Sequence, residues 1–193
     1  MKKNSRIAVF ASGSGTNAEE VFKYFQHHSS ISVVLLLCNN PKAAVLHRAV
    51  KYNIPAKLFN REEFSGSEKV LSWLQEMKVT HVVLAGFLWL LPEYLIKAFP
   101  GAIINIHPSL LPKFGGKGMY GSRVHEAVIQ SGESETGITI HVVNKHYDEG
   151  HVLYQASCKV EPTDTPELIA DKVHRLEHKY YSQVIERWID DSI

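Results

Sequence analysis

The chain has 193 residues, of which 45% are hydrophobic and 21% are charged. This length and composition are typical of one globular domain that buries a sizeable core without disulfide bonds. The formal net charge is only +1, which excludes a general electrostatic attraction to nucleic acid or to an anionic membrane surface.

Short apolar segments alternate with amphipathic segments along the chain. Strands are predicted over 7–11, 31–38, 56–59, 81–86, 102–106, 137–143 and 152–160. Helices are predicted over 17–26, 43–52, 66–77, 92–98, 123–130 and 166–189. The early strands are apolar at consecutive positions, which is typical of strands buried on both faces of a parallel sheet. The alternation predicts an α/β fold with a doubly wound, mostly parallel sheet and right-handed crossovers.

The C-terminal part of the pattern differs, because no helix is predicted between the last two strands. These strands are expected to form an antiparallel C-terminal extension of the sheet. Thr165 is the predicted N-cap of the final helix, and Pro166 is its first residue. One face of that helix is expected to pack on the core, with Ile169, Val173, Leu176, Tyr180, Val184 and Trp188.

Two features bear on the cellular compartment. The longest apolar run, 82–91, is too short to span a bilayer, so no membrane association is expected. Cys38 and Cys158 lie in apolar, strand-like runs and are expected to be buried free thiols and not a disulfide. Free thiols fit a reducing cytosol, so the expected location is cytoplasmic.

The first candidate site is the segment Ser12-Gly13-Ser14-Gly15-Thr16-Asn17, between the first strand and the first helix. Glycines let the backbone approach a ligand, and a helix N-terminus offers unpaired N–H groups to an anion. With Ala18 the segment matches a dinucleotide fingerprint, but the second strand ends in Cys38-Asn39-Asn40, without the acidic residue that holds a ribose. The pattern favours a monophosphate loop. The alternative is a plain turn with Asn17 as the helix cap.

Asn105 and His107 form the second candidate site, near the carboxyl end of a predicted strand. Residues two apart on a strand project to the same side, and Pro108 then stops the strand. Open α/β sheets bind their ligands at this end. An amide donor beside an imidazole could polarise and protonate a carbonyl placed between them. The alternative is that Asn105 caps a turn and His107 is a core histidine.

The third candidate is Asp148, in the turn Tyr147-Asp148-Glu149-Gly150. Asp and Gly are common in turns, so a purely structural role is the alternative. As a functional residue, Asp148 would raise the pKa of His107 by stabilising the imidazolium. No metal is expected, because zinc-site spacing is lacking among His141, His146 and His151.

Together these segments resemble the folate-dependent formyltransferases over nearly the whole chain. Each piece alone is unspecific, but their combination in this order is specific to that family. The matching segments are 13–17, 84–88, 105–112, 137–141 and 148–150. The resemblance implies a Rossmann-like formyltransferase fold in a single domain, 1–193. Its N-terminal half, about 1–100, would bind a nucleotide phosphate, and its C-terminal half, about 101–193, would bind folate and carry catalysis.

The resemblance also implies roles for individual residues. Asn105, His107 and Asp148 would be the catalytic trio. Gly15, Thr16 and Asn17 would hold the substrate phosphate, and His174 and Glu177 would contact the ribose or the amine. Folate would be bound by Arg61, Leu88, Trp89, Leu90, Leu91, Asn144, Lys145, His146 and Tyr147. Trp89 stands where an arginine is familiar in the family, and His174 stands where some members have a glutamine.

The implied reaction is transfer of the formyl group of 10-formyltetrahydrofolate, the cosubstrate, to the amine of glycinamide ribonucleotide in de novo purine biosynthesis. The partners would be these small molecules, with no nucleic acid and no membrane, and the protein would be a monomer or homodimer. One alternative is a sister formyltransferase with another amine acceptor. The other is a non-catalytic nucleotide-binding module that uses the first loop alone, which leaves Asn105, His107 and Asp148 unexplained.

Overall fold

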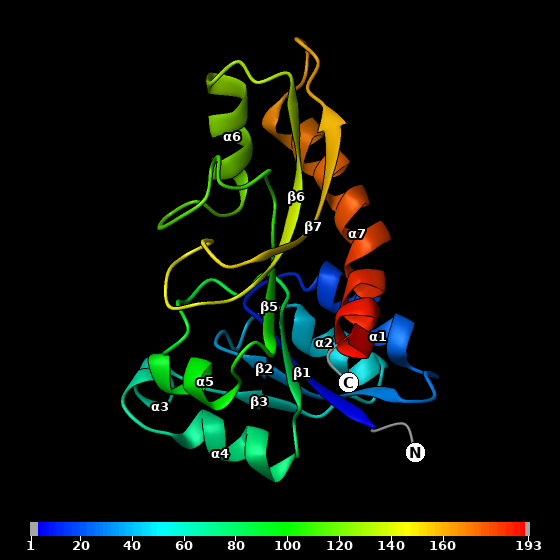
Figure 1. The fold of residues 1–193 in the computed structure, drawn as a ribbon, viewed down its shortest axis with the longest axis vertical. Helices are drawn as coiled ribbons and strands as arrows, with labels where there is room; N and C mark the ends of the chain where they lie inside the picture. Colours follow the sequence, from blue (N-terminus) through cyan, green and yellow to red (C-terminus); the bar gives the residue numbers. More distant parts are fainter. Residues whose placement is uncertain (1–3, 192–193) are drawn as a thin grey trace.

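The computed structural model describes residues 4–191, which form one seven-stranded sheet flanked by helices (Figure 1). The strands are β1 (Ser5–Ala11), β2 (Ile31–Cys38), β3 (Ala56–Leu58), β4 (His81–Leu84), β5 (Ile103–His107), β6 (Glu135–Val142) and β7 (Val152–Lys159). The helices are α1 (Thr16–Phe25), α2 (Val45–Lys51), α3 (Arg61–Ser65), α4 (Lys69–Glu76), α5 (Glu93–Ala98), α6 (Ser122–Gln130) and α7 (Pro166–Asp191). Every predicted strand and helix is present, with small shifts at the ends.

The strand order is β3-β2-β1-β4-β5-β6-β7. The strands from β3 to β5 pair in parallel, and β6 and β7 pair antiparallel, which confirms the predicted sheet and its antiparallel C-terminal extension. The chain runs outward from β1 to β3 and then returns to place β4 on the other side of β1. This reversal between β1 and β4 is the switch point of the sheet, where open α/β folds bind ligands at the carboxyl ends of the strands.

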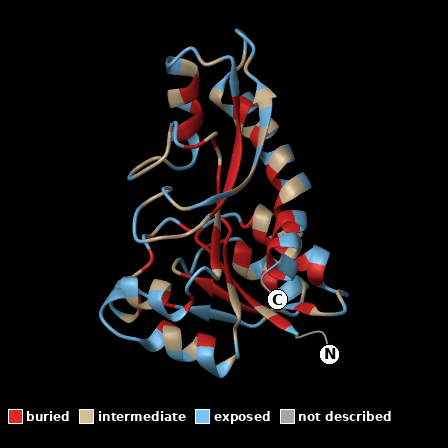
Figure 2. Cartoon of the chain, viewed as in Figure 1, coloured by how far each residue is buried: buried red, intermediate tan, exposed pale blue. Residues whose placement is uncertain are grey.

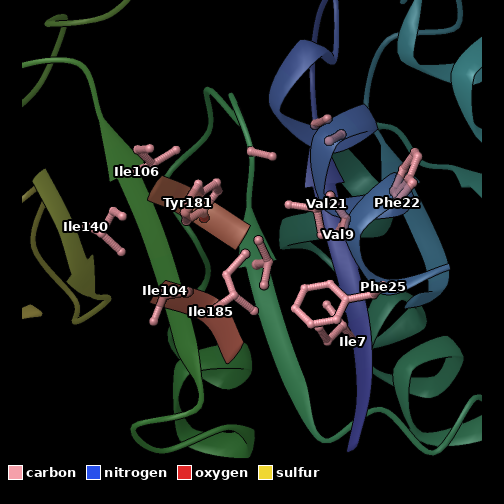
Figure 3. Packing of buried hydrophobic residues seen from close by; sticks show 14 of the residues in the cluster. Ile7, Val9, Val21, Phe22, Phe25, Ile104, Ile106, Ile140, Tyr181 and Ile185 are labelled. Atoms are coloured by element: carbon pink, nitrogen blue, oxygen red, sulfur yellow. The ribbon is translucent and has the colours of Figure 1, made fainter. Parts of the chain in front are cut away.

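The central strands are buried on both faces, as their consecutive apolar residues predict (Figure 2). On one face, Ile7 and Val9 pack with α1 and α7 (Figure 3). On the other face, Ala8 and Phe10 pack with apolar residues of α3, α4 and α5. Tyr181 of α7 is buried in the first cluster, and its hydroxyl donates a hydrogen bond of 2.8 Å to the Leu84 carbonyl at the end of β4. The last helix is thereby tied to the switch point.

One helix was not predicted, and the start of another was placed too early. The structure has the short α3 before α4, and α4 begins only at Lys69. Asn60 caps α3, because its side chain accepts from the Glu63 N–H at 2.9 Å, while the Glu63 carboxylate accepts from the Asn60 N–H at 3.0 Å. This capping box is readable in the sequence as Asn-x-x-Glu, a signal that hydrophobic periodicity alone does not contain.

The final helix starts as predicted, and its expected face packs on the core. The Thr165 hydroxyl accepts from the Leu168 N–H at 3.4 Å, and Pro166 is the first helical residue. Tyr180 packs against the core as expected, with its ring 5.1 Å from that of Tyr154 on β7, and the neighbouring Tyr181 is also buried. None of the helices within 4–191 is long and apolar enough to cross a membrane.

Both cysteines are free thiols, as expected, but only Cys38 is fully buried. Cys158 is half-buried, because it lies on β7, whose outer edge pairs with no further strand. The expectation of burial is therefore wrong for Cys158.

Candidate active site

A pocket of about 610 Å³ lies at the carboxyl ends of β1, β4 and β5. This volume is typical of sites that hold small-molecule ligands. Its walls come from segments 13–17, 84–91, 105–108, 116–121 and 146–148, with further residues from β6, α6 and α7. In Figure 1 the green loop before α6 and the yellow loop before β7 lie on the same side of the molecule, and Gly116 of the first bonds Asp148 of the second.

The glycine loop after β1 is shaped by Gly15, the N-cap of α1. Gly15 has φ +73°, and a Cβ there would lie 2.3 Å from Cγ2 of Val45 on α2, so only glycine fits. The first N–H groups of α1 have no intrahelical partner and are available to an anion. Asn17 is not the cap, because it lies inside α1, whose N-cap is Gly15, and its Nδ2 donates to Glu177 Oε2 at 2.9 Å. The expected capping role of Asn17 is therefore wrong.

Strand β5 places Asn105 and His107 in the pocket wall together. His107 Nε2 lies 2.8 Å from the Phe114 carbonyl and must donate, because a carbonyl only accepts. His107 Nδ1 lies 3.5 Å from Asp148 Oδ2. Because a neutral imidazole has one N–H, only the imidazolium can donate toward both groups. The structure thus brings Asp148 to the side of His107 opposite Phe114.

Burial is the main influence on the proton affinity of His107. It lowers the pKa of His107 below its usual 6.5, while Asp148 and the Phe114 carbonyl raise it only in part. Asp148 does raise the pKa of His107, as expected, but desolvation outweighs this attraction and the net pKa is lowered. For Asp148 itself, burial raises the pKa, but the bond with His141, the charge of His107 and the Gly116 N–H together lower it below its usual value. Asp148 is therefore ionised at neutral pH.

His141 on β6 is a site residue that the sequence did not single out. β6 pairs His141 with Asn105, and His141 Nε2 lies 3.2 Å from Asn105 Nδ2. Its Nδ1 donates to the Val142 carbonyl at 3.1 Å, which fixes the ring with Nε2 toward the Asn105 amide. This contact orients the amide and leaves the second Asn105 N–H free for a ligand. His141 Nε2 also lies 3.6 Å from Asp148 Oδ1.

Glu177 and His174 of α7 stand at the other end of the pocket, beside the glycine loop. Glu177 is only 5% exposed, and burial raises the pKa of its carboxyl, opposed by the Asn17 hydrogen bond and by His174. His174 Nε2 lies 3.9 Å from Glu177 Oε2. Glu177 links α7 to α1 through its hydrogen bond with Asn17. Glu177 and His174 are both polar groups in the pocket lining.

The residues expected to bind folate divide into two groups. Arg61, Asn144 and Lys145 do not line the pocket. The Arg61 guanidinium lies 3.9 Å from the centroid of the Trp89 ring, which does line it, so Arg61 is at the rim. Asn144 accepts from the His146 N–H at 2.8 Å and shapes the turn. The residues that do line the pocket are Leu88, Trp89, Leu90, Leu91, His146 and Tyr147.

The protein is thus an α/β protein with a doubly wound sheet and a pocket at the carboxyl ends of its central strands. The Formyl transferase family model matches residues 5–185, and the chain belongs to this family. It is 38% identical to the chloroplastic phosphoribosylglycinamide formyltransferase of Arabidopsis thaliana, covering 99% of this chain and 70% of that protein. It is 34% identical to the phosphoribosylglycinamide formyltransferase of Bacillus subtilis, covering 94% and 93%. The crystal structure of the Bacillus halodurans enzyme of that name superposes with a TM-score of 0.87 at 33% identity, covering 98% of this chain and 97% of the other.

Proposed function

We propose that the protein transfers the formyl group of 10-formyltetrahydrofolate to the amine of glycinamide ribonucleotide, in de novo purine biosynthesis. The names of relatives that match nearly the whole chain support this acceptor. The observation that carries the proposal is the convergence of Asn105, His107 and Asp148 on one pocket that also contains the glycine loop of α1. A cytoplasmic location is proposed as well, supported by the free thiols.

The ribonucleotide is proposed to bind with its phosphate at the N-terminus of α1. Gly15, Thr16 and Asn17 present the first backbone N–H groups of that helix. Glu177 and His174 line the pocket beside this loop. They form hydrogen bonds with the sugar in the proposed pose. This pose directs the amine toward Asn105 and His107 on β5.

The folate is proposed to occupy the other side of the pocket. Leu88 to Leu91, with His146 and Tyr147, would flank its ring, and Asn144 and Lys145 would contribute through the backbone of the turn. Trp89 holds the Arg61 guanidinium by a cation–π contact at the rim. Arg61 there can attract the carboxylates of the folate tail.

The proposed chemistry is direct attack of the amine on the formyl carbon. The new N–C bond places negative charge on the formyl oxygen, to which the free Asn105 N–H donates. His107 Nδ1 is the ring nitrogen available to the substrate, because Nε2 is bonded to Phe114. Collapse then breaks the bond between the formyl carbon and N10 of the folate. The amine loses one proton and N10 gains one, with His107 as the proposed carrier and Asp148 stabilising its charged form.

Replacing Gly15 by Ala tests the phosphate loop. The new Cβ would meet Val45, so the loop must shift, and we expect KM for glycinamide ribonucleotide to rise about tenfold or more while KM for folate changes little. His28→Ala is the control, because His28 contacts Glu186 and does not line the pocket. Steady-state kinetics on both variants measure this. Equal KM values for the two variants would contradict the assignment.

Replacing Asp148 by Asn tests its effect on the proton affinity of His107. Asp148 raises the pKa of His107, so its loss is expected to move the limb of the kcat profile that reports His107 to lower pH. Activity at neutral pH is expected to fall about 100-fold, because less of the imidazolium forms. The measurement is kcat against pH for both proteins. A superimposable profile would rule out this role.

A panel of amine acceptors tests the function itself. Purified protein is mixed with 10-formyltetrahydrofolate and one acceptor, and loss of the formyl group is followed by absorbance. We expect turnover with glycinamide ribonucleotide. Turnover with only a different amine would show that the protein is a sister formyltransferase with another acceptor. No turnover with any amine would favour the alternative of a non-catalytic nucleotide-binding module.

A further inference from the structure

His125 on α6 is a buried histidine that the proposed chemistry does not yet use. It lines the pocket and is only 4% exposed. Its Nδ1 is sealed inside the protein without a hydrogen-bond partner among residues 4–191. Nε2 is then the ring nitrogen left to the pocket. A polar atom in a pocket wall loses its water when a ligand binds, so a hydrogen bond to the ligand is needed to offset that cost.

The ring of His125 is neutral and has a defined tautomer. Burial, together with the charges of His174 and His107, lowers the pKa of His125 to about 4. An orphaned N–H inside a protein is rarer than an orphaned acceptor, so the sealed Nδ1 carries the lone pair. Nε2 therefore carries the hydrogen and is a donor.

His125 lies along a continuous polar wall of the pocket. Asn17 bonds Glu177, His174 stands beside Glu177, and His125 lies close enough to both His174 and His107 for their charges to affect it. In the proposed pose, with the phosphate at the α1 loop and the amine at His107, the atoms between them lie beside this wall.

We propose that His125 is a substrate-binding residue whose Nε2–H donates a hydrogen bond to an oxygen of the acceptor, between its phosphate and its reacting amine. The inference rests on the proposed function, because it takes the ribonucleotide as the ligand. A neutral donor suits this position. A second charged imidazole would repel His107 when that ring takes up its proton.

Two substitutions separate the hydrogen bond from the packing of the ring. His125→Met fills similar space without a donor, and His125→Gln places a donor near the position of Nε2. His28→Met is the control, because His28 is a partly buried histidine paired with Glu186 outside the pocket lining. Binding of glycinamide ribonucleotide is measured by calorimetry without folate. We expect His125→Met to weaken binding about tenfold, His125→Gln to restore most of it, and KM for folate to stay unchanged.

The second readout does not depend on the folding of any variant. In wild-type protein with ¹⁵N-labelled histidine, the Nε2–H signal of His125 is expected to shift on saturation with glycinamide ribonucleotide. Wild-type affinity in His125→Met, or an unmoved Nε2–H signal in a protein that binds the ribonucleotide, overturns the role of His125 alone. A wild-type protein that binds no glycinamide ribonucleotide overturns the proposed function together with this role.

Discussion

Replacing Asn105 or His107 by Ala is expected to lower kcat by about 10²–10³-fold with small changes in both KM values. Asn105 lies 3.2 Å from His141, which aims its amide into the pocket, and His107 stands between Phe114 and Asp148. In the proposed mechanism both groups act on charge that exists only in the transition state, so their loss is expected to lower kcat and to leave substrate binding unchanged. Steady-state kinetics at neutral pH with both substrates saturating give the measurement.

His28→Ala is the control for this pair, since it removes a histidine ion pair that does not line the pocket. Its kcat is expected to match that of the wild-type protein. Thermal unfolding of each variant separates loss of chemistry from loss of fold. If both pocket variants are folded and keep wild-type kcat, Asn105 and His107 do not stabilise the intermediate.

Replacing Gly137 by Ala is expected to destabilise the fold by about 3 kcal/mol. A Cβ on Gly137 would lie 1.9 Å from the Ala156 carbonyl oxygen, which belongs to the backbone of β7 and cannot rotate away. Strand β6 must separate from β7 to make room. Because β6 also carries His141, activity is expected to fall with stability.

Urea unfolding of Gly137→Ala measures this effect. The matched control is Gly13→Ala, where a Cβ meets nothing within 4 Å. A wild-type unfolding midpoint for Gly137→Ala would show that β6 and β7 pair more loosely than the structure describes.

Much of the fold was predictable, because its strongest signals are local. Consecutive apolar residues such as Ile7 to Ala11 report burial on both faces of a strand, and Thr165-Pro166 reports a helix start. The short α3 is not predicted from hydrophobic periodicity, because its five residues are too few to show a helical period. Asn60 and Glu63 nevertheless encode its cap.

The site was less predictable, because it depends on contacts between distant segments. Asn105 and His107 were found from their place at a strand end. His141 was not, since its role follows from the pairing of β6 with β5. His125 lies on a helix whose position no local pattern encodes. The lowered pKa of His107 was missed for the same reason, because burial of a ring depends on the loops packed around it.

The central claim is that one pocket passes a formyl group directly between two bound substrates. The most direct measurement uses 10-formyltetrahydrofolate with ¹³C in the formyl group, glycinamide ribonucleotide and wild-type protein, followed by NMR of the products. The account predicts that the label appears on the amine of the ribonucleotide, one for each folate deformylated. Label released as free formate, with an unmodified ribonucleotide, would contradict it.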